Sequence, residues 1–149
     1  KENLEEIKNF DVVIISDYNK GFLDDWSLIK IGQNSKLTFI DSKRKLSQEV
    51  VSNMDYIKLN YNEYINNKEI VDQNINKFII TLGANGAKYL NEIFPSPQPQ
   101  ETIDVSGAGD TFISSLVIKY LETKDLSKSI NYANKMSSLV VSKRGVVTP

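Results

Sequence analysis

Residues 104–112 read Asp-Val-Ser-Gly-Ala-Gly-Asp-Thr-Phe and stand directly before a stretch with helical periodicity. Gly107 and Gly109 allow the backbone to turn tightly and to present its N–H groups without side-chain obstruction. The helix that follows adds the positive end of its dipole, so this stretch predicts a cradle for an anion. Asp110 lies at the mouth of that cradle, where its carboxylate could take a proton from a hydroxyl. The combination favours phosphoryl transfer, although the spacing alone fits an ordinary capped helix start about as well.

Two helices are expected to close the chain after this motif. In the first, apolar residues fall on one face at helical spacing: Ile113, Leu116, Val117, Tyr120 and Leu121. The second is expected over residues 125–144, with Asp125 as its N-cap and Gly145 as its stop. Neither the G-x-x-x-x-G-K-[ST] loop nor the G-x-G-x-x-G dinucleotide pattern occurs, which excludes those two ways of binding phosphate.

Upstream of the motif, short apolar strands alternate with helical stretches. Strands are predicted over residues 11–16, 36–41, 54–59 and 77–83, and helices over 24–34 and 62–67. This alternation indicates βαβ units, so the expected fold class is α/β, with a mainly parallel sheet flanked by helices. Asn85-Gly86 lies between two apolar runs and favours a tight hairpin turn, which predicts a short antiparallel pair there.

Polar clusters follow three of the predicted strands. They are Asp17 with Lys20, Asp41 with Lys43, and Lys58 with Asn60 and Glu63. The carboxyl ends of parallel strands share one edge of a sheet, where open α/β folds bind their ligands. The clusters together could therefore receive a phosphorylated ligand and its metal. For any one cluster a polar turn is the simpler interpretation, and it is the favoured one for the first cluster.

Composition removes several classes of mechanism. The 149 residues include no His and no Cys, which excludes histidine bases, histidine-ligated zinc, thiolate catalysis and disulfides. The 18 basic residues against 19 acidic ones give a net charge of −1, so no broad surface for nucleic acid is expected. The first residues lack the apolar core of a signal peptide, and no run approaches the roughly 20 residues of a membrane span. A cytoplasmic location is therefore expected.

The motif DVSGAGDTF resembles the signature of the ribokinase-like (pfkB) carbohydrate kinases. In the same order as in that family, KLNYNEY (58–64), TLGANGAKYL (81–90) and NKMSSLVVSKRG (134–145) resemble three further elements. Within the family, SDYNKGFL (16–23) and FIDSKR (39–44) resemble the kinase half of the bifunctional heptose-7-phosphate kinase/ADP-heptose synthase. The resemblance implies a ribokinase-like fold and ATP-dependent phosphorylation of a sugar or sugar phosphate.

The resemblance also implies a role for each residue that matches a family motif. Asp110 matches the catalytic base, and Gly107, Ala108 and Gly109 match the anion hole. ATP and Mg²⁺ are the implied cofactors, and the implied cofactor-binding residues are Lys58, Asn60, Glu63, Thr81, Gly83, Gly86 and Asn134. Glu63 is expected to help place Mg²⁺, directly or through water or phosphate. Asp104 and the backbone of residues 143–145 match a site for a monovalent cation such as K⁺.

Purely structural interpretations compete with some of these roles. Lys58 and Glu63 could form an ordinary surface pair, an interpretation that the accompanying motifs disfavour. Thr81 and Gly86 could serve the hairpin alone, and Asn134 could be a solvated helix residue.

The family pattern is longer than this chain, and the matches begin in the middle of that pattern. We therefore expect residues 1–149 to be the C-terminal, nucleotide-binding and catalytic half of a carbohydrate kinase domain, truncated at the N-terminal side and inactive alone. An exposed sheet edge would favour a homodimer, or a missing N-terminal half, as the partner. The alternative functions are a non-catalytic nucleotide- or anion-binding module, an assembly partner, or a remnant without activity. Within the kinase class the alternatives are ribokinase, fructokinase and nucleoside kinase.

Overall fold

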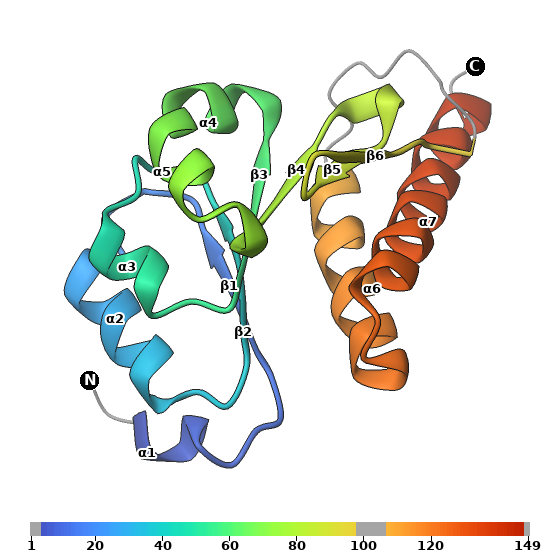
Figure 1. Ribbon diagram of the computed structural model, residues 1–149. Coiled ribbons are helices and arrows are strands. Elements are labelled where there is room, and N and C mark those ends of the chain that lie inside the picture. The colour runs from blue at the N-terminus through green and yellow to red at the C-terminus, as the bar shows by residue number, and fades with distance from the viewer. Residues whose placement is uncertain (1–3, 98–106, 148–149) are drawn as a thin grey trace. The chain divides into compact units, whose positions relative to one another are not determined.

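The computed structural model describes residues 4–97 and 107–147, the last six of them through their backbone alone. The chain forms two compact units, Lys1–Ile80 and Thr81–Pro149 (Figure 1). Asp104 and its neighbour Ser106 lie outside the described residues, so the predicted cation ligand stays a prediction. In the part of the chain that the structure describes, no helix is long and apolar enough to cross a membrane.

The first unit carries strands that the sequence predicts. They are β1 (Val13–Asp17), β2 (Thr38–Ser42), β3 (Tyr56–Asn60) and all but the last residue of β4 (Phe78–Thr81), and they lie in that order. β1 pairs with β2 and β2 with β3, both in parallel. The register sets Ser16 beside Asp41 and Asp41 beside Lys58, so two of the predicted polar clusters meet at the carboxyl ends of the strands.

Short helices flank these strands. They are α1 (Leu4–Ile7), α2 (Asp25–Asn34), α3 (Gln48–Ser52), α4 (Tyr61–Asn66) and α5 (Lys68–Gln73), followed by the 3₁₀ turn η1 (Ile75–Lys77). Asp24 caps α2 by accepting a hydrogen bond from the Ser27 N–H at 2.8 Å, close to the predicted start. Helices α3 and α5 were not predicted, because segments of five and six residues are too short to show helical periodicity.

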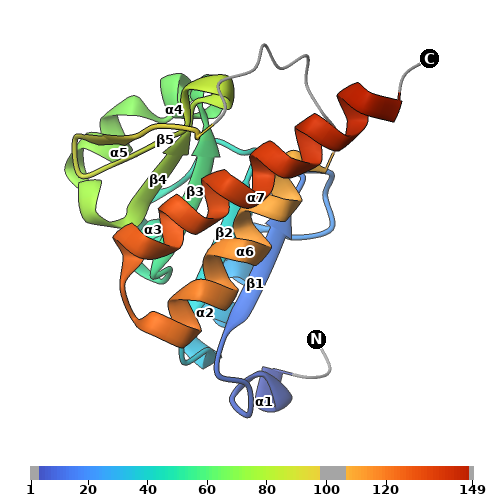
Figure 2. The ribbon, with the colours of Figure 1, turned by 90° about the vertical axis from the view of Figure 1, so that its right-hand side faces the viewer.

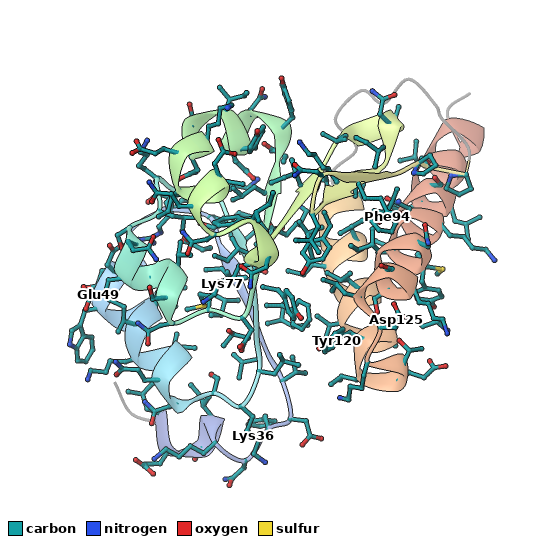
Figure 3. The ribbon with its side chains drawn as sticks, viewed as in Figure 1. Lys36, Glu49, Lys77, Phe94, Tyr120 and Asp125 are labelled. Atoms are coloured by element: carbon teal, nitrogen blue, oxygen red, sulfur yellow. The ribbon has the colours of Figure 1, made fainter. Side chains whose placement is uncertain are left out.

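The core of the first unit lies between the strands and the helices α2 and α3, which lie side by side (Figures 1 and 2). Its fully buried side chains include Leu28, Phe39, Ile40, Val50, Val51, Ile57 and Leu59. Lys77 (Figure 3) closes the end of α3, since its ammonium donates to the carbonyls of Val51 at 3.0 Å and Met54 at 2.9 Å.

The second unit consists of a β-hairpin and two helices. β5 (Ala87–Tyr89) and β6 (Glu92–Phe94) pair in antiparallel fashion, and α6 (Ala108–Thr123) packs along α7 (Leu126–Val147) (Figures 1 and 2). Asp125 caps α7 as predicted, because its carboxylate accepts the Lys128 N–H at 3.1 Å. The buried residues of the helix pair include Phe112, Leu116, Ile130 and Ala133.

Two predictions for the second unit are wrong in detail. The hairpin turns at Leu90-Asn91, which have φ values of 51° and 64°, and not at Asn85-Gly86. Asn85 lies instead in a 3₁₀ turn, η2 (Gly83–Asn85), and the Gly86 carbonyl closes that turn by accepting the Leu82 N–H at 2.8 Å. Gly145 does not stop α7, which continues to Val147 because one glycine near a helix end costs only about 1 kcal/mol.

Candidate functional site

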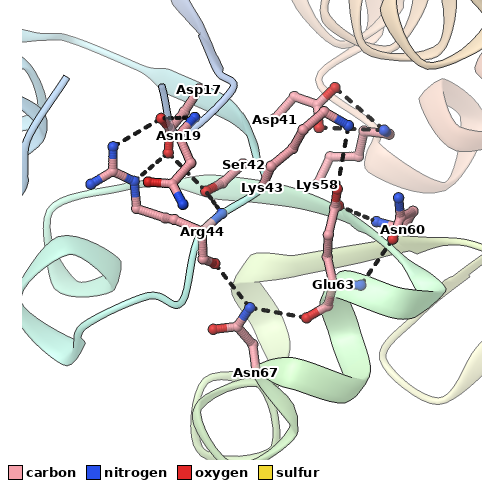
Figure 4. Close-up of polar contacts among 10 residues, drawn as sticks. All are labelled: Asp17, Asn19, Asp41, Ser42, Lys43, Arg44, Lys58, Asn60, Glu63 and Asn67. Atoms are coloured by element: carbon pink, nitrogen blue, oxygen red, sulfur yellow. Dashed lines mark hydrogen bonds and ion pairs between the residues drawn. The ribbon is translucent and has the colours of Figure 1, made fainter. Parts of the chain in front are cut away.

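The carboxyl ends of β2 and β3 hold a nearly buried ion pair between Asp41 and Lys58 (Figure 4). The Lys58 ammonium lies 3.3 Å from an Asp41 oxygen, and the two side chains are 8% and 13% exposed. Burial raises the pKa of the Asp41 carboxyl above its usual value, although the charge and hydrogen bonds of Lys58 act against the rise. The alternative interpretation of Lys58 and Glu63 as an ordinary surface pair is wrong, because Lys58 pairs with Asp41 and Glu63 with Lys43. The Lys58 ammonium is held by the Asp41 carboxylate at the carboxyl ends of β2 and β3.

Asn60 and Glu63 form a reciprocal cap at the start of α4. The Asn60 side chain accepts the Glu63 N–H at 2.9 Å, and the Glu63 carboxylate accepts the Asn60 N–H at 2.7 Å. This capping box explains locally why Asn and Glu occur three residues apart. The second Glu63 oxygen lies 3.5 Å from the ammonium of Lys43, a half-exposed side chain that water or a metal could displace.

The carboxylates at these strand ends can supply one or two ligands to a magnesium ion but cannot complete its coordination. Among residues 4–97 and 107–147, no three metal-ligating side chains gather into one group. Mg²⁺ usually keeps several waters and binds through one or two carboxylates together with substrate phosphates. Glu63 and the neighbouring Asp41 fit that pattern, in which the remaining oxygens come from water and from a phosphorylated ligand.

Asp17 and Arg44 form a second buried ion pair, and sequence reasoning missed Arg44. The guanidinium binds both Asp17 oxygens, the Nη2 contact measuring 2.9 Å, and the side chains are 10% and 2% exposed. Asp17 also accepts the Ser42 hydroxyl at 3.0 Å and the Asn19 N–H at 3.1 Å. The simple turn interpretation of Asp17 is therefore wrong, because this carboxylate joins several segments of the first unit.

The Asp17–Arg44 pair predicts a loss of stability in acid. Burial alone would raise the Asp17 pKa, but Arg44, Asn19 and Ser42 together hold that pKa below its usual value. A carboxyl with a depressed folded pKa stabilises the fold above the unfolded pKa of about 3.9 and loses that effect as pH falls through the folded value.

We expect Asp17→Asn to lower the free energy of unfolding by about 3 kcal/mol near pH 7. The difference between variant and wild type should shrink once pH falls below about 4. Urea unfolding of both proteins from pH 7 down to about pH 2 measures it, and a difference that stays constant over that whole range would contradict the pairing.

In the second unit, Gly107 starts α6 in the conformation that the motif predicts. It has φ 99° and ψ −16°, and its carbonyl accepts the Thr111 N–H at 2.9 Å. Gly107 has no side chain with which to cap the helix, and no side chain of the described residues accepts from the amides of the first turn. Asp110 is exposed in that same turn, and the Ala108 carbonyl is tied to α7 by the Ser137 hydroxyl at 3.3 Å. A helix start that fits the predicted anion cradle and a solvent-facing carboxylate thus occur together.

The remaining predicted residues of the second unit have clear structural surroundings. Gly86 is buried with φ 94°, against the backbone of the chain just after β6, whereas Gly83 is exposed with φ 59°. Thr81 ends β4. The Asn134 amide is 5% exposed and donates to the carbonyl of Phe94 (Figure 3) at 2.9 Å, so the solvated interpretation of Asn134 is wrong. The adenine contact implied for Asn134 stays a prediction.

The family model of the pfkB carbohydrate kinases matches residues 27–149. The chain belongs to the pfkB family of carbohydrate kinases. Its curated relatives include the bifunctional protein HldE of Helicobacter acinonychis (strain Sheeba), which is 32% identical over 95% of this pfkB chain. HldE of Campylobacter curvus (strain 525.92) is 29% identical over 97% of the chain. In each case the chain spans 35% of the relative's length.

Solved structures show that the pfkB chain has the ribokinase-like α/β fold. Arabidopsis thaliana ribokinase, complexed with ribose and ATP, superposes with a TM-score of 0.75 at 18% identity, covering 95% of this chain and 53% of that one. The Methanocaldococcus jannaschii nucleoside kinase gives a TM-score of 0.71 at 20% identity, covering 90% and 50%. The predicted fold class, with its parallel strands and antiparallel hairpin, is confirmed.

Proposed function

We propose that residues 1–149 are the nucleotide-binding and catalytic half of an ATP-dependent carbohydrate kinase domain. One observation carries the proposal, namely the start of α6 at Gly107, where no side chain of the described residues caps the helix and Asp110 is exposed in the first turn. Backbone amides at a helix start bind phosphate oxygens, and a nearby carboxylate can act as a base toward a hydroxyl. Membership of the pfkB family supports joining these two properties into one reaction.

In the proposed reaction, Asp110 takes the proton of the acceptor hydroxyl as that oxygen attacks the γ-phosphorus of ATP. The bond between the γ-phosphorus and the bridging oxygen breaks, and ADP leaves with the electron pair. The amides of Gly107, Ala108 and Gly109 stabilise the negative charge that develops on phosphate oxygens, since charge stabilisation supplies much of the catalysis in phosphoryl transfer.

Nucleotide and metal are proposed to use the strand-end residues of the first unit. Lys58 and Lys43 offer positive charge to phosphate, and Glu63 offers one oxygen to Mg²⁺ or its water shell. Bound Mg²⁺ would neutralise phosphate charge. Thr81, Gly83 and Asn134 are proposed to contact the nucleotide, and Asp104 to hold a monovalent cation. We propose a cytoplasmic enzyme because its phosphoryl donor is ATP.

The acceptor is proposed to be a seven-carbon sugar phosphate. Residues 16–23 and 39–44 support this choice through their resemblance to heptose-phosphate kinases. The HldE relatives also support it, because their similarity extends over 95% and 97% of the chain. Ribokinase and nucleoside kinase are structural neighbours, so pentoses and nucleosides are the competing acceptors to include in an assay.

The proposed partner is the further polypeptide that longer relatives possess, bound at the edge of β1. The Val13 N–H and the Asp17 carbonyl both bond toward β2. Because alternate residues of a strand point their peptide groups to opposite sides, those of Ile14 and Ser16 point outward. Ile14 is also 42% exposed, and β1 carries no Lys or Pro that would block another strand. Light scattering that finds a stable homodimer would favour a second copy at this edge instead.

Calorimetry and a transfer assay together test the proposed function. The longest polypeptide containing this chain is mixed with ATP·Mg²⁺ and, in turn, heptose 7-phosphate, fructose, ribose and adenosine. Binding together with ADP release on the seven-carbon acceptor supports the proposal. Binding without transfer to any acceptor supports a nucleotide-binding module, and absence of binding overturns both.

A further inference from the structure

The loop between β1 and α2, residues 18–24, displays large side chains to solvent. Phe22 is 92% exposed and Tyr18 is 51% exposed. Asn19 and Gly21 have φ values of 55° and 84°, so the loop follows a defined path through left-handed conformations. These exposed side chains contribute little to the core, so the conformation of the loop must be fixed by other contacts.

Arg44 holds both ends of this 18–24 loop. Before the loop it binds the two oxygens of Asp17, near the end of the loop it donates to the Leu23 carbonyl, and just after the loop it donates to Asp25 at 3.1 Å. Arg44 reaches these groups from the chain between β2 and α3, far away in sequence (Figure 4 shows its pairing with Asp17). The Arg44 side chain, which is only 10% exposed, thus joins the two ends of the 18–24 loop.

The contacts of Arg44 matter more for the geometry of the loop than for the stability of the fold. Taking two charges out of water costs about as much as their attraction returns, so a buried ion pair seldom stabilises a fold more than apolar residues would. A guanidinium is, however, a planar fork with several donors in fixed directions, and it orients each partner that it binds. The contacts of Arg44 therefore fix the position of the 18–24 loop.

The same short segment also supports the predicted nucleotide residues. Ser42 donates to Asp17, Lys43 pairs with Glu63, and the Arg44 carbonyl accepts the Asn67 amide at 3.1 Å (Figure 4). Three consecutive residues thus join the end of β1 to the start and end of α4.

The nucleotide residues proposed in this unit are Lys43, which follows β2, and residues from β3 onward, which leaves the β1 end of the same strand edge for the acceptor. We infer that Arg44 is a positioning residue that holds the 18–24 loop as a wall of the acceptor subsite, an inference that rests on the proposed function.

Trypsin tests the loop itself without any activity assay. The only trypsin site within the 18–24 loop is the bond after Lys20, and exposed Lys36 provides a reference site outside it. In Arg44→Gln we expect cleavage after Lys20 to become at least tenfold faster, with cleavage after Lys36 unchanged. Lys68→Gln, which removes an exposed ion pair with Asp72, is the matched control and should leave both rates unchanged. Equal acceleration at both sites, or none, would overturn the assignment.

A kinetic comparison then tests the acceptor subsite. With heptose 7-phosphate as the probe, Arg44→Gln should raise the acceptor KM about tenfold and leave the KM for ATP within twofold. Arg44→Lys, which keeps the charge but loses the planar fork, should fall between wild type and Arg44→Gln. Equal changes in both KM values would overturn the acceptor assignment. If wild-type protein phosphorylates no acceptor, the proposed function fails, and the acceptor role fails with it, whereas the trypsin result still decides what holds the loop.

Discussion

Asp110→Asn is expected to lower the turnover number for phosphoryl transfer by a factor of about 10²–10⁴, the usual contribution of a general base. Asparagine keeps the size and shape of the side chain but cannot accept the proton of the acceptor hydroxyl. Asp110 is exposed in the first turn of α6, and no hydrogen bond or ion pair of its side chain contributes to the described fold. Folding and the Kd for ATP·Mg²⁺ should therefore change little.

Glu122→Gln is the matched control, since it removes one carboxylate charge from the other end of the same helix. Glu122 is exposed and makes only a long pair with Lys119 at 3.5 Å, so turnover should stay near the wild-type value. Steady-state kinetics of the three proteins, with calorimetry for ATP·Mg²⁺, makes the comparison. Near-normal turnover in Asp110→Asn would show that another group removes the proton.

The sequence predicted those parts of the fold that depend on local pattern. Apolar runs identified the strands β1 to β4, and β2, β3 and β4 are buried over most of their length, as such runs predict. Asp24 and Asp125 were recognisable because N-caps have a short sequence signature. The hairpin turn was misplaced because Leu90 adopts a positive φ that its residue type disfavours. Asn85-Gly86 has the residue types of a hairpin turn, but it belongs to the 3₁₀ turn before β5.

The candidate site was predictable only where its contacts are local. Asn60 and Glu63 lie three residues apart, and their capping box follows from that spacing. Arg44 lies 27 residues from Asp17 in sequence, and no pattern in either segment predicts that the two side chains form an ion pair. A single arginine beside a lysine-rich stretch looks like a surface charge, and only the parallel register of β1 and β2 reveals its partner.

Gly86→Ala is expected to destabilise the second unit by roughly 3–5 kcal/mol, combining backbone strain with overpacking. The new Cβ would stand 2.0 Å from the Phe94 carbonyl oxygen and 2.7 Å from the Ser96 nitrogen. Both are backbone atoms, which cannot rotate away as a flexible side chain could. The positive φ of 94° adds strain that any L-residue with a side chain would feel. Chemical denaturation of the purified variant measures the loss.

Alanine substitutions at two other glycines separate backbone strain from crowding as causes of that loss of stability. Gly21 has φ 84° with nothing within 4 Å of a new Cβ, so Gly21→Ala should show strain alone, about 1–2 kcal/mol. Gly32 has ordinary φ, but its Cβ would meet the Asn53 carbonyl oxygen at 2.2 Å, so Gly32→Ala should show crowding alone, about 1–3 kcal/mol. Gly86→Ala should exceed both. If it instead keeps full stability and loses only ATP affinity, Gly86 serves the nucleotide directly and the packing explanation is wrong.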